Sequence, residues 1–429
     1  MEPKTRTYLC IDMKTFYASV ECAERGVNPF ETNLVVADES RGKNALCLAI
    51  SPKMKDQGVK NRCRLSEIPK SIKYEIALPR MQLYIDYAAD IYSIYLDYFA
   101  PEDIHVYSID ESFLDVTDYL KIYHLTPRQM AKRLMDEIAN RKRIPSTAGI
   151  GTNLFLAKIA LDITAKHSPD HMGYLDEELF RKTLWDHRPI TDFWMVARGT
   201  ANRLARYGID TMGGVAHAPV ELLHRLFGIN YELLYDHAWG REPCLISDIK
   251  EYKSKSQSVS FSQILPRDYT FDEARTVFDE MVQHGCLELM RRHVITHHLS
   301  FFVGYSHDLY EPAKGSVKMS ETTALFSKIG PYFDRMYDAK VNRSLAIRRL
   351  GLCFDDVCDE GCEGYDLFTD FEKVEKEKAQ ERAVLEIKDK FGKNAILRGT
   401  NLMKGATQRE RNEMIGGHRA GYDDPKRPS

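Results

Sequence analysis

The chain has 429 residues, of which 43% are hydrophobic and 29% are charged. This length is too great for one ordinary hydrophobic core and predicts about three domains. The net charge of −3 argues against a uniformly basic nucleic-acid binder. No long apolar run is present, so we expect no membrane span and no membrane partner. Nine cysteines, an odd number, fit a reducing compartment, and we expect a cytoplasmic monomer without a signal peptide.

The first 170 residues predict an α/β layered domain that is interrupted early by an insertion. A short strand ends at Asp12 and a helix begins just after it. Apolar residues at helical spacing predict a long helix over 81–99. A hairpin around Asp110 and Glu111 comes next. Predicted elements then follow in the order helix, strand and helix, over 126–141, 146–151 and 153–166.

The second half of the chain predicts a helical region, a joint and a second α/β region. Residues 171–241 indicate short helices punctuated by glycine, and the polar stretch 248–260 has the composition of a tether. A charged amphipathic helix is expected over 371–391, and the chain beyond Met403 is expected to be frayed. The second α/β region should contain elements at 257–265, 271–292, 299–305, 327–336 and 347–354.

Three carboxylates stand at the ends of predicted strands. Asp110 and Glu111 interrupt two β-rich runs, and Asp12 ends the first strand. Hard cations such as Mg²⁺ take oxygen ligands, and two of them can clamp the attacking and leaving oxygens of a phosphoryl transfer. The alternative is that an acidic pair at a turn is simply solvated.

Three segments in this order resemble the Y-family DNA polymerases, in particular their DinB/UmuC-like branch and the UV-damage repair type of Gram-positive bacteria. The segments are 11–21 (IDMKTFYASVE), 107–115 (YSIDESFLD) and 149–160 (GIGTNLFLAKIA). The resemblance implies an α+β multidomain fold of the right-hand polymerase type, with a βαββαβ palm, small fingers, a helical thumb and an α/β little finger. The implied parts are a palm at 1–16 and 79–168, fingers at 17–78, a thumb with a helix-hairpin-helix-like segment at 169–241, a linker at 242–256, a little finger at 257–352 and a C-terminal tail at 353–429.

The resemblance also assigns roles around the carboxylates. Asp12, Asp110 and Glu111 match catalytic residues that hold two Mg²⁺ ions, and Met13 matches a position that lends its backbone carbonyl to a metal. Tyr17 matches a steric gate that rejects ribonucleotides by shape. The other positions that match nucleotide-binding residues are Phe16, Lys55 and Lys158.

For Phe16 and Tyr17 the alternative is packing in the core. Two departures from the family pattern stand beside these matches: Lys14 occupies a position that is often acidic, and Pro52 replaces a tyrosine. The residues 195–214 look like the hairpin of the thumb, although Met195 and Ala197 stand where its glycines are expected.

Partners follow from the resemblance in the same way. Primer–template DNA and deoxynucleoside triphosphates are expected, with DNA phosphate contacts at Lys253, Lys255, Ser256, Ser258, Arg291 and Arg292. The segment 364–368 resembles a degraded peptide for the bacterial sliding clamp, with Asp366, Leu367 and Phe368 as its contacts. For Leu367 and Phe368 the alternative is packing against the preceding domain.

These observations predict a template-directed DNA polymerase that performs low-fidelity translesion synthesis in DNA damage tolerance. Two alternatives stay open. One is a two-metal nuclease or cyclase on a palm-like fold, which would use the same carboxylates but not Tyr17. The other is a non-catalytic regulatory protein that keeps the fold as a DNA-damage binding platform.

Overall fold

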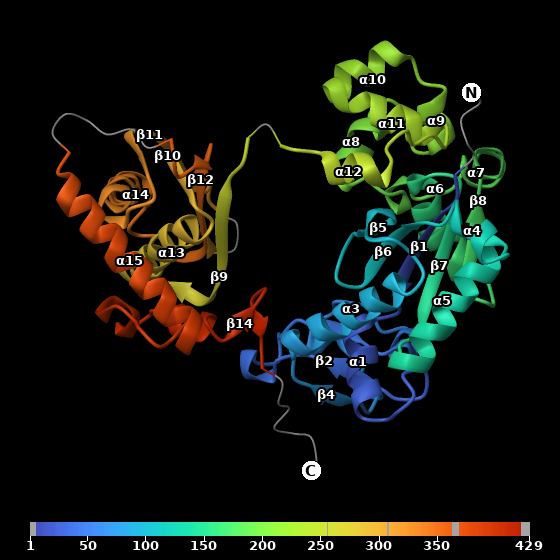
Figure 1. The fold of residues 1–429 in the computed structure, drawn as a ribbon, viewed down its shortest axis with the longest axis horizontal. Coiled ribbons are helices and arrows are strands. Elements are labelled where there is room, and N and C mark those ends of the chain that lie inside the picture. Colours follow the sequence, from blue (N-terminus) through green and yellow to red (C-terminus); the bar gives the residue numbers. More distant parts are fainter. Residues whose placement is uncertain (1–5, 255, 307–308, 363–368, 422–429) are drawn as a thin grey trace. The chain divides into compact units, whose positions relative to one another are not determined.

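The computed structural model describes residues 6–254, 256–306, 309–362 and 369–421 (Figure 1). The chain divides into two compact units, and the second of them spans Lys253–Ala420. In the described part of the chain, no helix is long and apolar enough to cross a membrane.

The first unit is built on a five-stranded mixed sheet with β1 at its centre. The strand order is β5-β6-β1-β7-β8, where β1 pairs antiparallel with both neighbours and β7 pairs parallel with β8. The apolar run that forms β1 is buried, as expected for a strand covered on both faces. The strands are β1 (Tyr8–Met13), β5 (Ile104–Val106), β6 (Glu111–Asp115), β7 (Ser146–Gly151) and β8 (Met172–Leu175).

Helices cover this sheet, and a small second sheet lies in the inserted segment. The small sheet has the order β3-β2-β4 and encloses its own core around Val35, Ile50 and Met54. Its strands are β2 (Leu34–Val36), β3 (Ala49–Ile50) and β4 (Glu75–Ala77), and the helices of this part are α1 (Phe16–Glu24), α2 (Pro52–Asp56), α3 (Met81–Leu96), α4 (Tyr119–Ile122), α5 (Pro127–Lys142) and α6 (Leu154–Ile159).

Short helices complete the first unit. The first part of the stretch 248–260, which the sequence predicted as a tether, is helical instead. It belongs to the helix Ile246–Glu251, whose residue Ile246 is buried beside Tyr8 and Phe113. The apolar Ile246 and Ile249 outweigh the polar composition that suggested a tether. The helices are α7 (Glu177–Leu184), α8 (Arg198–Ala205), α9 (Met212–Ala216), α10 (Val220–Phe227), α11 (Tyr231–Ala238) and α12 (Ile246–Glu251).

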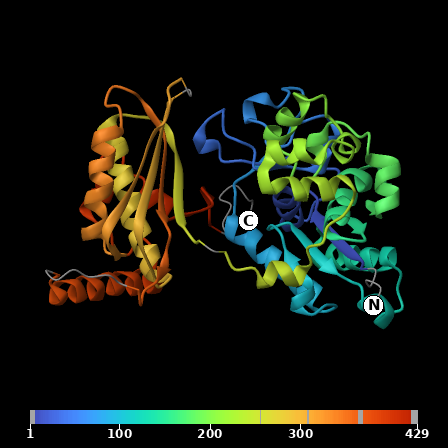
Figure 2. The ribbon, with the colours of Figure 1, turned by 90° about the horizontal axis from the view of Figure 1, so that it is seen from above.

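The second unit is an antiparallel sheet with helices on one face, as Figure 2 shows. The strand order is β11-β10-β12-β9, and β13 extends the pairing of β10. Its elements are β9 (Val259–Tyr269), α13 (Phe271–Arg291), β10 (Val294–Tyr305), β11 (Ala313–Thr323), α14 (Phe326–Lys340), β12 (Ile347–Asp355) and β13 (Cys358–Asp359). Strand β11 was not predicted, because its sequence AKGSVKMSETT is mostly polar.

The C-terminal segment packs against α13 instead of fraying after Met403. The carboxylate of Glu280, which is 1% exposed, accepts hydrogen bonds from Asn401 Nδ2 (2.9 Å), Thr407 N (2.8 Å) and Gln408 N (3.1 Å). The segment contains α15 (Phe371–Phe391), α16 (Gln408–Arg411), β14 (Met414–Ile415) and β15 (His418–Arg419). The expectation of a frayed end is therefore wrong as far as residue 421.

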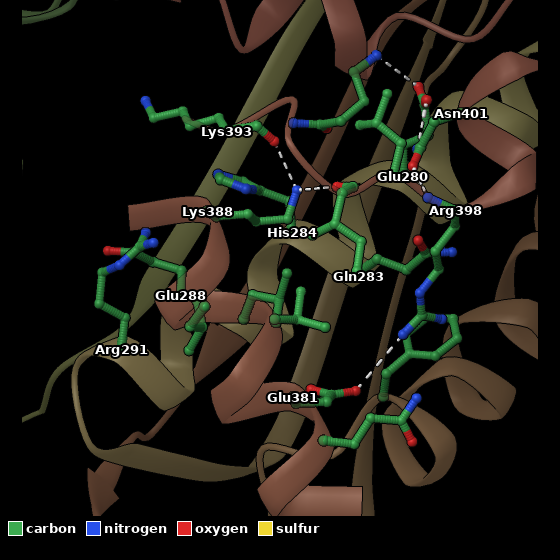
Figure 3. Close-up of a pocket in the computed structure, with 18 of the residues that line it drawn as sticks. Glu280, Gln283, His284, Glu288, Arg291, Glu381, Lys388, Lys393, Arg398 and Asn401 are labelled. Atoms are coloured by element: carbon green, nitrogen blue, oxygen red, sulfur yellow. Dashed lines mark hydrogen bonds and ion pairs between the residues drawn. The ribbon is translucent and has the colours of Figure 1, made fainter. Parts of the chain in front are cut away.

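A cavity of about 980 Å³ lies between α13, α15 and residues 393–412. Figure 3 shows Glu280 directed toward Asn401 and Glu381 directed toward Arg398 in its wall. Burial raises the pKa of Glu381 to about 7. None of the residues predicted to bind metal or nucleotide lines this cavity.

Candidate active site

The pairing of β1 with β6 brings the predicted carboxylates together across almost a hundred residues of sequence. Asp12 lies directly opposite Glu111 in the antiparallel register. The next residue pair is joined as well, because Met13 N donates a hydrogen bond to Asp110 O at 2.9 Å. All three acidic residues therefore stand at one edge of the central sheet.

The turn before β6 fixes the two acidic residues that follow it. Tyr107 N and Ser108 N both donate to the carbonyl oxygen of Glu111, at 3.0 and 3.1 Å. The hydroxyl of Ser108 donates to Asp110 Oδ1 at 2.7 Å. Backbone and side chain together hold Asp110 beside the end of β1.

The pKa of Asp12 reflects both its burial and the negative charge gathered at this edge. The pKa of Asp12 is raised to about 7, chiefly by burial and in addition by the negative charges of Asp110 and Glu111. Carboxylates that repel one another at short range are stabilised by a cation between them. The oxygen donors and their excess negative charge fit a hard divalent ion such as Mg²⁺.

The side chain of Glu111 is not free to bind a metal ion in this structure, because both of its carboxylate oxygens accept hydrogen bonds from other residues. Its Oε2 accepts a hydrogen bond from Lys158 Nζ at 2.8 Å, and its Oε1 accepts one from Cys10 Sγ at 3.1 Å. Among the residues that the structure describes, no group of three or more His, Cys, Asp or Glu side chains is arranged to hold a metal ion. The two-Mg²⁺ site thus stays a prediction, and it requires Glu111 to exchange Lys158 for a metal ion.

Lys158 reaches Glu111 because α6 lies very close to β7. A Cβ atom on Gly149 would come within 2.1 Å of Ala157 O, and one on Gly151 within 2.1 Å of Ala157 N. Only glycine allows this approach. Burial lowers the pKa of Lys158, but the charges of Glu111, Cys10 and Asp162 together leave it above its ordinary value.

The two aromatic residues after the strand have different environments. Phe16 is 2% exposed and packs in the core, which favours the packing alternative for this residue. Tyr17 is only partly buried, and its ring centroid lies 4.7 Å from that of Tyr84. Tyr84 is fixed in turn, because its hydroxyl donates to the buried carboxylate of Glu21 at 2.7 Å.

Lysines surround the carboxylate edge. Lys55, at the C-terminal end of α2, is exposed, and the charges that act on it are those of Asp12 and Lys166. Lys14, for which the sequence gave no interpretation, is also close enough to Asp12 for the negative charge of Asp12 to act on its pKa. The sequence offered no signal for Lys14 beyond its departure from the acidic residue common in the family.

The predicted DNA-contact residues fall into two groups. Lys253, Ser256 and Ser258 are exposed before β9. Arg291 and Arg292, at the end of α13, form ion pairs with carboxylates of Glu288 and, for Arg291, of Asp389. Both arginines line the cavity beside α15, so their prediction as DNA contacts loses support.

The strand register reveals a polar face that the sequence analysis did not assign. In β10 and β12 the side chains packed against the helices alternate with side chains on the opposite face. Beside the acidic Asp355, whose carboxylate accepts a hydrogen bond from Ser300, that opposite face carries basic and hydroxyl residues, which the alternation within the sequence KGSVK of β11 would have indicated. They are Ser260, Ser262, Ser300, Lys314, Ser316, Lys318 and Arg349.

Some predictions lie outside the described residues. These are the DNA contact at Lys255 and the clamp contacts at Asp366, Leu367 and Phe368.

Comparisons with known proteins give the class of protein to which this fold and carboxylate edge belong. Residues 11–162 match the model of the impB/mucB/samB family, and residues 256–367 match the model of its C-terminal domain. The chain therefore belongs to the impB/mucB/samB family, which consists of Y-family DNA polymerases.

Similar individual proteins come from Bacillus subtilis (strain 168). UvrX, whose name connects it with UV-damage repair, is 31% identical over 97% of this chain and 98% of its own length. DNA polymerase IV 2 is 31% identical over 97% of this chain and 99% of its own length. A solved Y-family DNA polymerase chimera, Dbh-Dpo4(243-245)-Dbh, matches with a TM-score of 0.64 at 18% identity, over 82% of this chain and 99% of the other. This likeness confirms the expected multidomain fold of α-helices and β-sheets.

The raised pKa of Asp12 predicts a pH-dependent gain in stability for Asp12→Asn. A shift from 3.8 to about 7 corresponds to roughly 4 kcal/mol at most, since each pKa unit is worth about 1.4 kcal/mol. Below about pH 4 the carboxyl of Asp12 is neutral in both the folded and the unfolded protein and costs no stability. As the pH rises from there through 7, the original protein loses stability, because the folded state must come to hold a buried negative charge. Urea unfolding in EDTA should therefore show the variant more stable than the original protein at pH 8, with a smaller difference at pH 5.5.

Added Mg²⁺ should stabilise the original protein at pH 8 more than the variant. An equal difference between the two proteins at both pH values would contradict the electrostatic origin of the effect.

Proposed function

We propose that this protein is a template-directed DNA polymerase that extends primers with low fidelity past damaged template bases. The observation that carries the proposal is the register of β1 and β6, which sets Asp12 opposite Glu111 and beside Asp110. The polymerase names of several relatives support it. Primer extension by the purified protein with deoxynucleotides and Mg²⁺ tests it.

In this proposal Asp12, Asp110 and Glu111, with the carbonyl of Met13, hold two Mg²⁺ ions. When bound, the ions activate the primer 3′-hydroxyl and neutralise charge on the leaving pyrophosphate. The β1–β6 pairing holds the acidic residues in place, and Lys158, once released by Glu111, is close enough to the site to bind a nucleotide phosphate. Lys55 adds positive charge from the inserted segment.

Tyr17 acts as the steric gate. Its ring packs against that of Tyr84 at a tilt of 33°, and the hydrogen bond from Tyr84 to Glu21 restricts movement of the pair. Arg80 completes this support, because it donates to both carboxylate oxygens of Glu21 at 2.9 and 2.8 Å. A ring held in this way would leave no room for a 2′-hydroxyl on the incoming sugar.

The parts of the polymerase map onto the described elements. The central sheet with α3 and α5 would be the palm, the small sheet around β2 the fingers, and α7 to α11 the thumb. The second unit would be the little finger, with the tail packed on its helices. DNA phosphates would lie along the polar face of its sheet and contact Lys314, Lys318, Arg349 and the exposed residues Lys253, Ser256 and Ser258. Lys255 remains a further proposed contact.

The two alternative functions have weaker support. A nuclease or cyclase has no need of an aromatic gate, and a regulatory protein has no need of three adjacent acidic residues. Cleavage of DNA without synthesis would favour the first, and damage-dependent function without catalysis would favour the second.

Removal of one carboxylate should abolish synthesis. Asp110→Asn should lower the rate of primer extension by at least about a hundredfold, because a lost metal ligand removes several kcal/mol of charge stabilisation. The matched control is Asp136→Asn on the exposed face of α5, which should extend primers like the original protein. Full activity of Asp110→Asn would refute the catalytic assignment.

Shortening the gate should admit ribonucleotides. Tyr17→Ala should reduce the preference for dATP over ATP, measured as a ratio of kcat/KM values, by about tenfold or more. Tyr17→Phe keeps the ring and should keep the preference. Unchanged sugar selectivity in Tyr17→Ala would remove the gate assignment.

We also propose the bacterial sliding clamp as a partner of Asp366, Leu367 and Phe368, on the basis of the sequence resemblance alone. Replacing both Leu367 and Phe368 with alanine should leave distributive synthesis unchanged and abolish stimulation by the clamp. Replacing Asp423 and Asp424 with alanine is the control. Equal stimulation of all three proteins would rule out this contact.

A further inference from the structure

Lys14 stands at the carboxylate edge in an unusual setting. It follows β1 directly, and its backbone N–H donates to Pro145 O at 2.8 Å, which fixes the chain just past Asp12. Its partly buried side chain crosses the sheet edge to His171, whose ring nitrogens Nδ1 and Nε2 lie 3.1 and 3.3 Å from Lys14 Nζ. His171 immediately precedes β8.

The charges around Lys14 leave its ammonium without a direct counter-ion. The groups that act on it are Asp56, Lys55 and Asp12, in decreasing order. Among the described residues, no carboxylate oxygen lies within 4.0 Å of the ammonium nitrogens of Lys14 or Lys55. Lys55 in turn lies close enough to Lys166 for the two charges to repel.

His171 is a suitable partner for a lysine that binds an anion. A neutral imidazole accepts one hydrogen bond from the ammonium and so fixes its direction. It does not neutralise the positive charge, as a carboxylate would. Two donors of the ammonium stay available for a ligand, and the ring of Phe30, with its centroid 5.7 Å from Nζ, covers the lysine from the inserted segment.

We propose that Lys14 binds the terminal phosphates of the incoming nucleotide and that His171 is the positioning residue for its ammonium. This inference rests on the proposed polymerase function. A deoxynucleoside triphosphate is the strong anion that must approach Asp12 in that reaction, and Lys14 and Lys55 together supply separate cations for it. The competing explanation is that Lys14 only packs on Phe30 and His171.

The kinetics of five proteins test the assignment: the original protein, Lys14→Gln, Lys14→Arg, His171→Ala and the double variant Lys14→Gln/His171→Ala. Primer extension with dATP opposite thymine should give a KM about tenfold higher for Lys14→Gln, with kcat changed less than about threefold. Lys14→Arg, which keeps the charge, should restore most of the affinity. His171→Ala should raise KM by a smaller factor, and the double variant should match Lys14→Gln, because His171 acts through Lys14.

Lys182→Gln is the matched control, since it removes the positive charge of an exposed lysine on α7 in the same unit and should leave KM unchanged. A KM for Lys14→Gln equal to that of the original protein would overturn the inference and leave the polymerase function standing. A fall in kcat alone would also overturn it.

Direct binding separates the two proposals. The affinity for dATP is measured on DNA with a dideoxy-terminated primer, so that no synthesis occurs. Affinity that falls in Lys14→Gln supports the phosphate contact even if the original protein extends primers poorly. If the original protein neither binds dATP nor extends primers, the proposed function and this inference both fail.

Discussion

The antiparallel pairing of β1 with β6 is the constraint on which the rest of the first unit depends. It sets Asp12 opposite Glu111 and joins Met13 N to Asp110 O, so the backbone ladder holds together side chains that repel one another. A shift of one residue in this register would turn Asp12 to the other face of the sheet. The tight packing of β1 on both faces resists such a shift, because each side chain would have to pack against the opposite layer. The packing of β1 in the core therefore offsets the electrostatic repulsion among the three carboxylates.

Positive charge lies near this edge on three sides. Lys158 lies on α6, which packs closely on β7 at two glycines, and Lys55 lies on the inserted segment. Lys14 comes from the end of β1 itself. Only Lys158 is paired directly with one of the three carboxylates, at 2.8 Å from Glu111. The other two cations lie near the edge without neutralising it, an arrangement suited to a ligand that carries both metal ions and phosphates.

The parts that the sequence predicted are those with a local signal. The helices over 81–99, 126–141 and 271–292 have apolar residues at helical spacing, and the carboxylates mark strand ends. Strand β11 escaped prediction because its outward residues are polar and its inward apolar residues, Ala313, Val317 and Met319, are separated by glycine, lysine and serine. The contact of Lys158 with Glu111 also escaped, since a lysine's choice of partner depends on the position of α6 in space. The described part of the tail beyond Met403 is held by hydrogen bonds to the side chains of Glu280 and Gln263, and no periodicity in the sequence indicates such contacts.

The attachment of the tail to Glu280 has a consequence for how the protein meets other molecules. Asn401, Thr407 and Gln408 converge on one carboxylate that belongs to the helix layer under the β9–β12 sheet. Leu385 of α15 adds to the same hydrophobic core. Residues 401–408 are thus attached to the second unit. Any partner that captures residues near 400 therefore competes with the hydrogen bonds that these residues donate to Glu280.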